Sequence, residues 1–328
     1  MRYVVYGAGA VGGVIGGHLS LAGRQVTLVA RGAHLAAIRE GGLRLDTGAG
    51  MRVIVAPATD SAAEIDWSPD TVVVLAVKSH QAAEALSDLR AHAPAQTPII
   101  CATNGIATEV AALRDFDRVY AVCVMLPATH LEPGVVVAKC SPTPGILDVG
   151  RIPDGTDDLT AEVAGDLRAA GFESEQRADI LSWKRRKLLL NIGNGVDASF
   201  EPGADADELA ARALAEGERV LGLSGVSLVS AADDRDRRGE ILHRLRMTYD
   251  CADVGEGCRD SIGECLVGLD KTKLHHGARV LVHIAAILRG PSQRKARMKL
   301  RTFALFALGG DVSTHHAGEP LRNHEAKA

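Results

Sequence analysis

Three glycines near the start of the chain have the spacing of a loop that cradles phosphate groups. The pattern Gly7-x-Gly9-x-x-Gly12 follows an apolar run at residues 2–6, opens a stretch of small residues at 12–22, and precedes a second apolar run at 26–30. In such a strand–turn–helix–strand unit, the first glycine permits a tight turn, the second lets the backbone approach a pyrophosphate, and the third lets the helix pack on the strand. The sequence therefore predicts that a dinucleotide diphosphate binds at Gly7, Ala8, Gly9, Ala10, Val11 and Gly12.

The residue after the second apolar run indicates which dinucleotide is bound. Folds that bind NAD usually carry an acidic residue there, which accepts a hydrogen bond from the ribose 2′-hydroxyl. This chain instead has Arg31, followed by Gly32, and no carboxylate before Glu40. Because a guanidinium suits a 2′-phosphate, the sequence predicts NADP(H). The alternative is an ordinary solvated arginine after a strand.

Polar residues follow two further apolar runs of the same half. Lys78 comes after the run at 71–77, and Asn104 comes after the run at 98–103. The carboxyl ends of parallel strands border the ligand crevice in a doubly wound sheet, so both side chains are expected at one site. Taken singly, Lys78 reads equally well as a surface lysine, and Asn104-Gly105 reads equally well as a turn.

A second set of polar residues lies in the stretch 179–194, which is expected to form a helix. At about 100° per residue, Lys187, Asn191 and Asn194 fall within about 40° of one another on one face. Asparagine is a mediocre helix former, so two of them beside a lysine suggest a function other than solubility. The alternative is a basic surface helix with incidental asparagines.

Composition limits what the chain can be. It has 328 residues, 46% of them hydrophobic, and a net charge of −4, which fits two soluble domains and argues against a nucleic-acid or membrane-surface protein. No run of eighteen uncharged apolar residues occurs, and the N-terminus leads directly into a predicted strand instead of a signal peptide. We therefore expect an intracellular, cytoplasmic protein whose cysteines are reduced thiols.

The prolines and the strand-like runs divide the chain. Nine of the twelve prolines, and all the expected strands, lie in the first 153 residues. We predict a nucleotide-binding domain over residues 1–177, a helical substrate domain over 178–308, and a polar tail over 309–328. The six expected strands after the first two cover 52–56, 71–77, 98–103, 118–126, 134–138 and 145–149.

Taken together, these motifs resemble the ketopantoate reductase (2-dehydropantoate 2-reductase) family. The likeness covers about residues 1–200 and includes the glycine turn and Leu28-Val29-Ala30-Arg31-Gly32 with His34-Leu35. It continues through Val77-Lys78-Ser79, Asn104-Gly105-Ile106 and Lys187-Leu188-Leu189-Leu190-Asn191. The resemblance implies an α/β fold, a Rossmann-type doubly wound sheet followed by an all-helical C-terminal domain, with the active site between them. It also implies NADPH-dependent reduction of a 2-oxo acid, most simply of 2-dehydropantoate to pantoate in pantothenate biosynthesis.

The resemblance also assigns roles to single residues. Lys187 resembles the catalytic general acid, because only it stands four residues before Asn191 in the family pattern K-L-x-x-N. Asn191 resembles a substrate-binding asparagine, and Asn194 lies one residue before the place of a second one. Lys78 and Asn104 resemble the lysine and asparagine that contact cofactor and substrate. A cationic donor at the carbonyl strengthens its interaction as oxyanion charge develops, and we expect Lys184, Arg185 and Arg186 to lower the pKa of Lys187.

The last third of the chain departs from the family pattern. We find neither the family's serine-rich segment nor its glutamate between residues 231 and 300, where Glu240, Ser261 and Glu264 read more simply as solvated residues. Cys251, Cys258 and Cys265 recur every seven residues without zinc-site spacing, so no metal is expected. The alternative function is an NADP-binding protein without turnover, whose divergent helical half serves interaction or sensing. A homodimer through that half is compatible with the sequence.

Overall fold

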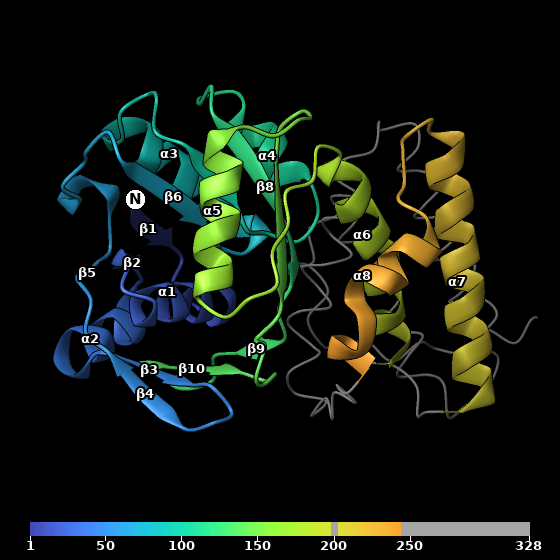
Figure 1. Ribbon diagram of the computed structural model, residues 1–328, viewed down its shortest axis with the longest axis horizontal. Coiled ribbons are helices and arrows are strands. Elements are labelled where there is room, and N and C mark those ends of the chain that lie inside the picture. The colour runs from blue at the N-terminus through green and yellow to red at the C-terminus, as the bar shows by residue number, and fades with distance from the viewer. Residues whose placement is uncertain (198–202, 244–328) are drawn as a thin grey trace, which may run out of the picture. The chain divides into compact units, whose positions relative to one another are not determined.

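The first part of the chain is built on a seven-stranded sheet in the order β11-β8-β7-β6-β1-β2-β5 (Figure 1). This computed structural model describes residues 1–197 and 203–243. All neighbouring strands of the sheet are parallel except β8 and β11, which are antiparallel. The strands are β1 (Arg2–Tyr6), β2 (Gln25–Val29), β5 (Ala58–Thr59), β6 (Thr71–Leu75), β7 (Ile99–Cys101), β8 (Val119–Met125) and β11 (Ile146–Arg151). The order reverses beside β1, as in doubly wound sheets, so the predicted fold class is confirmed.

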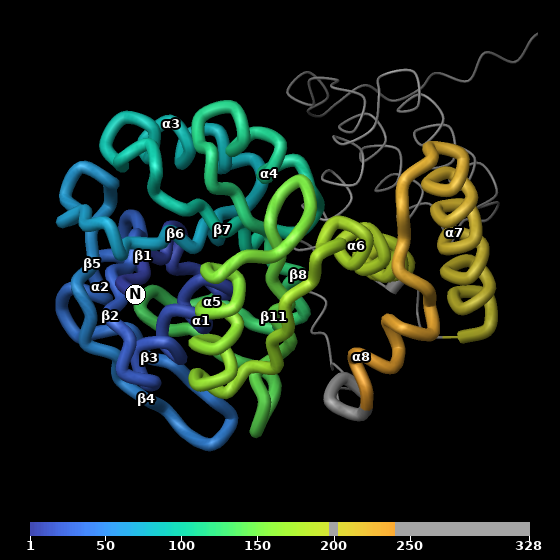
Figure 2. Tube along the Cα trace, turned by 45° about the horizontal axis from the view of Figure 1, so that its top comes forward, coloured from blue at the N-terminus to red at the C-terminus, as the bar shows by residue number. Residues whose placement is uncertain are grey.

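Helices cover both faces of this sheet because its central strands are apolar on both sides. Along β1, Tyr3 and Val5 face one buried cluster, while Val4 and Tyr6 face the other. The first cluster is completed by α1 (Ala10–Leu21) and α5 (Asp158–Ala169), and the second by α3 (Ala82–His92) and α4 (Ala107–Ala112). Figure 2 shows the strands between these two helix layers. The continuous apolar runs of the sequence therefore become strands buried on both faces.

A smaller four-stranded sheet supports the helix that follows the glycine turn. It has the order β4-β3-β10-β9, with β3 (Leu43–Asp46), β4 (Met51–Ile54), β9 (Ala128–Thr129) and β10 (Val135–Ala138). A Cβ added to Gly13 of α1 would lie 2.7 Å from Val136 of β10, so only a residue without a side chain allows this approach. The helix α2 (Gly32–Gly41) connects β2 to this sheet.

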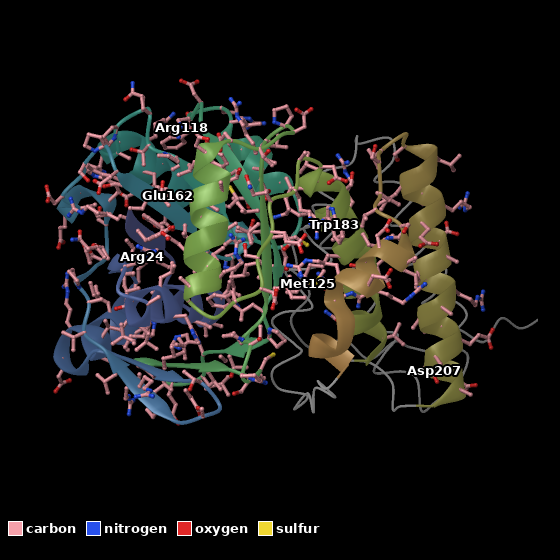
Figure 3. The ribbon with its side chains drawn as sticks, in the orientation of Figure 1. Arg24, Arg118, Met125, Glu162, Trp183 and Asp207 are labelled. Atoms are coloured by element: carbon pink, nitrogen blue, oxygen red, sulfur yellow. The ribbon has the colours of Figure 1, made fainter. Side chains whose placement is uncertain are left out.

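Three described helices follow the sheet, namely α6 (Ile180–Asp197), α7 (Ala204–Leu223) and α8 (Ala231–His243). Leu189 and Ile192 of α6 lie so close to Gly217 of α7 that a Cβ there would be 2.8 Å from each of them. Trp183 of α6 and Met125 of β8, both labelled in Figure 3, belong to one buried cluster. The helical half therefore packs on the sheet through α6.

The six strands expected after the first two are all present, with ends that differ by up to two residues from the sequence ranges. The first long helix after the sheet begins at Ile180, close to the predicted domain boundary at residue 177. The predicted tail over 309–328 and the residues Ser261, Glu264, Cys251, Cys258 and Cys265 lie outside the described residues. No helix in the described part combines the length and the apolar character needed to cross a membrane.

One buried carboxylate connects three parts of this fold. Asp148 of β11 is 2% exposed and accepts a hydrogen bond from the N–H of Glu175 at 2.9 Å. Arg177 Nε donates to it at 3.1 Å, and Arg237 of α8 donates through Nε and Nη2 at 2.9 and 2.7 Å. Such a bidentate, charge-assisted contact is among the stronger hydrogen bonds in proteins. Asp148 therefore fixes α8 and the segment before α6 to the edge of the sheet.

We expect the substitution Asp148→Asn to lower the free energy of unfolding by about 3 kcal/mol, because two largely buried guanidinium groups then lose their carboxylate. Urea unfolding at pH 7 measures this change. The matched control is Asp66→Asn, because the Arg2–Asp66 pair is also an ion pair, but Asp66 is 89% exposed and should contribute less than about 1 kcal/mol. Equal losses in the two variants would contradict the assigned role of Asp148.

Candidate functional site

The glycine turn joins β1 to α1 at the carboxyl edge of the sheet. Gly7 has a φ of 99°, a conformation that side chains disfavour. The N–H groups of Gly7 and Ala8 both donate to the carbonyl of Val29, at 3.0 and 2.9 Å, which fixes the turn to the end of β2. A Cβ on Gly12 would lie 2.1 Å from the Gly7 carbonyl oxygen. The turn and the helix therefore approach each other as the sequence predicted.

The N-terminus of α1 is suited to an anion. Gly9 caps the helix without a side-chain hydrogen bond, so the first N–H groups of the helix have no intrahelical partner. The helix dipole adds positive potential at the same place. An ideal Cβ on Gly9 meets no atom within 4 Å, so there is space above the turn. These features fit a diphosphate, and its binding at Ala10 and Val11 stays a prediction.

His34 holds the glycine turn in place through hydrogen bonds of its side chain. His34 Nδ1 accepts a hydrogen bond from the N–H of Gly134 at 2.8 Å, so Nε2 carries the proton and donates to the Ala8 carbonyl at 2.7 Å. Burial lowers the pKa of His34, and the neighbouring ring of His130, 4.0 Å away, lowers it further. The neutral imidazole therefore connects the glycine turn to the start of β10. In the sequence, His34 was identified only as part of a motif.

Arg31 lies where the sequence placed it, between the end of β2 and the start of α2. Its side chain is 48% exposed, and Nη1 donates to Glu84 Oε2 of α3 at 2.8 Å. The guanidinium is thus held at the carboxyl edge of the sheet by a carboxylate that the sequence did not reveal as its partner. Nothing in the sequence indicated this contact, because Arg31 and Glu84 lie fifty-three positions apart, one at the end of a strand and the other on a helix.

The two predicted strand-end residues occupy the same edge of the sheet. Lys78 follows β6 and precedes the short helix η2 (Ser79–Gln81), and its N–H donates to Gln81 Oε1 at 3.4 Å. Asn104 follows β7, in a turn where Gly105 has a φ of 73°. Both residues therefore lie at the carboxyl ends of parallel strands, where ligands of such sheets bind.

The helical half contributes Lys187 to this edge. Lys187 Nζ donates to Asn104 Oδ1 at 2.5 Å, across eighty-three positions of the chain. A small cavity surrounds this contact, and Asn191 also lines it. Asn194 is half-buried on the same helix and is not among the lining residues. The lining residues are Thr103, Asn104, Gly105, Val122, Val124, Lys184, Lys187, Leu188 and Asn191.

The other basic residues of α6 make contacts that the sequence did not reveal. Lys184 is buried and makes an ion pair with Glu109 of α4 at 2.5 Å, and Arg186 is paired with Glu218 of α7. Arg185 donates to the carbonyl of Ser227 at 3.3 Å. Two of the three cations expected to act on Lys187 are therefore neutralised by carboxylates. The sequence missed Glu109, which looks like an ordinary acid in the first turn of a helix.

Comparison with known proteins supports the resemblance to ketopantoate reductases. Residues 3–154 match the family model for ketopantoate reductase PanE/ApbA. The 2-dehydropantoate 2-reductase of Pyrococcus horikoshii is 29% identical over 202 residues, which cover 61% of this chain and 64% of that protein. The chain thus aligns with less than two thirds of that relative's length.

Solved structures share the fold. The PanE/ApbA family ketopantoate reductase from Ralstonia eutropha JMP134 superposes with a TM-score of 0.71 at 22% identity, over 94% of this chain and 99% of that one. The ternary structure of D-mandelate dehydrogenase with NADH and anilino(oxo)acetate has a TM-score of 0.68 at 17% identity, with the same coverage of 94% and 99%. The resemblance inferred from the motifs is therefore confirmed: residues 3–154 are similar to the ketopantoate reductase family.

Proposed function

We propose that this protein is an NADPH-dependent reductase of a 2-oxo acid, with 2-dehydropantoate as the first substrate to test. The observation that carries the proposal is the contact of Lys187 with Asn104 at a cavity that Asn191 also lines. An ammonium and two amides can bind a carbonyl and a carboxylate together. The match of residues 3–154 to the family model and the name of the Pyrococcus relative support the choice of substrate.

The chemistry assigned to the chain is the stabilisation of negative charge. When bound, the dihydronicotinamide supplies the hydride for the carbonyl carbon. Charge then develops on the carbonyl oxygen, where Lys187 stabilises it and donates the proton that forms the hydroxyl group. Asn104 holds the ammonium at the cavity, and Asn191, one helical turn further along α6, adds a neutral donor for the substrate. Lys187 thus interacts more strongly with the transition state than with the substrate.

The nucleotide is assigned to the glycine turn and to the strand ends beside it. The diphosphate would be held by the free N–H groups at the start of α1, and Lys78 lies at the neighbouring strand end. Arg31 would bind the 2′-phosphate of NADPH, for which its contact with Glu84 must open or rearrange. D-mandelate dehydrogenase, which shares this fold, was solved with NADH, so the choice between the two nucleotides rests on Arg31.

Further parts of the proposal rest on the sequence. They are a cytoplasmic location, no metal requirement, and a homodimer formed through the helical half. Asn194 is retained as a substrate contact only if the substrate extends along α6 beyond Asn191, because the cavity does not reach Asn194.

We expect Lys187→Met to lower kcat by about 100-fold, because the general acid and its charge are removed, and to leave the Kd of NADPH unchanged. Loss of NADPH absorbance with 2-dehydropantoate and a panel of other 2-oxo acids measures turnover. Arg185→Met is the control, since it removes a cation from the same helix but not from the cavity lining. Unchanged turnover in Lys187→Met would exclude Lys187 from the mechanism, and a wild-type protein that binds NADPH but reduces none of these acids would favour the non-catalytic alternative.

Arg31 and Glu84 should affect nucleotide choice in opposite directions. Arg31→Ala should weaken NADPH binding by about tenfold or more, with little effect on NADH, because it removes a charge-assisted contact to the 2′-phosphate. Glu84→Gln should tighten NADPH binding, because the arginine loses a competing carboxylate. Fluorescence titration with both nucleotides tests this. Equal losses for NADPH and NADH in Arg31→Ala would show that Arg31 does not recognise the phosphate.

Gly12→Ala should abolish nucleotide binding, because the added Cβ would overlap the Gly7 carbonyl and displace the turn from α1. Gly41→Ala is the matched control, since a Cβ there meets no atom within 4 Å. Titration of both variants with NADPH, together with circular dichroism to verify folding, gives the comparison. A folded Gly12→Ala protein with wild-type affinity would contradict the assignment of the turn.

A further inference from the structure

We propose that Lys184 and Glu109 form a buried positioning pair that places Lys187 against Asn104. This inference goes beyond the family assignment and rests on the proposed function in one respect, namely that Lys187 acts on a substrate. The side chains of Lys184 and Glu109 are 3% and 1% exposed, so the pair lies in the interior, where Lys184 also lines the cavity, and solvent does not separate its charges.

Lys184 connects three segments through a single ammonium group. Nζ donates to the carbonyl of Thr103 at 2.8 Å and to the carbonyl of Val122 at 3.2 Å, and it lies 2.5 Å from Glu109 Oε1. Thr103 and Glu109 flank the turn that carries Asn104, and Val122 belongs to β8. The three polar contacts of Lys184 therefore fix α6 to both sides of this turn and to the adjacent strand.

The register of these contacts couples Lys184 to Lys187. Residues three apart on a helix are neighbours on its surface, so Lys184 and Lys187 lie one above the other on α6. Lys184 binds the carbonyl of Thr103, and Lys187 binds the side chain of the next residue, Asn104. They form two adjacent contacts of one helix–turn interface. A shift of α6 that breaks the first contact would also displace the second.

Glu109 has a second role, which is to balance the positive charge of Lys184. A buried ammonium without a partner is strongly unfavourable, and near Lys187 it would also favour loss of the Lys187 proton. Although burial disfavours the charged form of Lys184, Glu109 raises the pKa of this ammonium, which stays protonated through neutral pH. The other titratable groups that face the pair are the thiols of Cys101 and Cys123, whose pKa values burial raises, that of Cys123 to about 11. Burial raises the pKa of the Glu109 carboxyl, and the Lys184 ammonium opposes that shift. The ionised pair adds no net charge beside Lys187, while Lys184 supplies the hydrogen bonds to Thr103 and Val122.

Three variants of the full chain separate position from charge: Lys184→Met, Glu109→Gln and the double variant. The readouts are kcat and KM for the 2-oxo acid, the Kd of NADPH, the pH profile of kcat, and hydrogen exchange of the segments 103–109 and 180–191. Arg186→Met is the matched control, because it removes another buried cation of α6 whose contacts are with Glu218 and Val229 rather than with the 103–109 turn. It should lower thermal stability and leave the pH profile unchanged.

The positioning role predicts a distinct pattern. Lys184→Met should lower kcat by about tenfold or more and speed exchange of 103–109, while the Kd of NADPH changes less than about twofold. In Glu109→Gln, the unpaired ammonium should move the basic limb of the kcat profile to lower pH by about half a unit or more, because Lys187 must be protonated to act. The double variant should restore the position of that limb but not kcat, because the bonds to Thr103 and Val122 are still missing.

The outcomes that overturn the proposal are equally specific. Wild-type kcat and wild-type exchange in Lys184→Met would show that the pair does not position the site. Losses that parallel those of Arg186→Met, with no change in the pH profile of Glu109→Gln, would reduce the pair to a stabilising contact. If the wild-type protein reduces none of the 2-oxo acids, the proposed function fails, and the exchange data alone still decide whether Lys184 docks α6 on the 103–109 turn.

Discussion

The contact between Lys187 and Asn104 is the constraint on which the site depends, because it joins the parallel sheet to the helical half of the chain. Asn104 ends a strand of a parallel sheet, and Lys187 lies on the first helix after that sheet. Their contact requires that β7 end at this point, that α6 lie against β8, and that the helix present one particular face. Each of these conditions has its own structural cause.

The helical half is attached to the sheet by paired charges as well as by apolar packing. Trp183 supplies buried apolar area, but Lys184 with Glu109 and Asp148 with Arg237 add buried ion pairs at two other points of the same interface. Buried ion pairs contribute little net stability relative to well-packed apolar residues. Removing one partner is nevertheless costly, since the remaining charge is left buried without water or a counter-charge. Such contacts tolerate few alternative arrangements. They therefore favour one register of α6 and α8 on the sheet over nearby ones of similar apolar area.

The sequence was sufficient for the features that have a local cause. Apolar runs, the glycine spacing and the density of prolines predicted the strands, the turn and the change to helices. The choice of Lys187 among four consecutive basic residues came from the resemblance to the family pattern K-L-x-x-N. What could not be predicted depends on residues far away in the chain. Lys184 and Arg185 are adjacent and chemically alike in the sequence, but one is buried against Glu109 and the other contacts the carbonyl of Ser227. Helical periodicity predicts which face of a helix a residue occupies. The partner of that residue depends on how the helix packs against the rest of the protein.

The proposed binding of the nucleotide and the proposed reduction of the substrate depend on separate parts of this structure. The glycine turn is fixed by Val29 and His34, both of which lie within the first domain. Lys187, the proposed acid, contacts Asn104, and Lys184 of the same helix contacts the neighbouring carbonyl of Thr103. A sequence can therefore lose one function and keep the other, which is why a nucleotide-binding protein without turnover is a physically coherent alternative for any member of this fold. In this chain the lysine, the asparagine of the turn and the buried Lys184–Glu109 pair belong to one helix–turn interface, so the features that the proposed catalysis requires occur together.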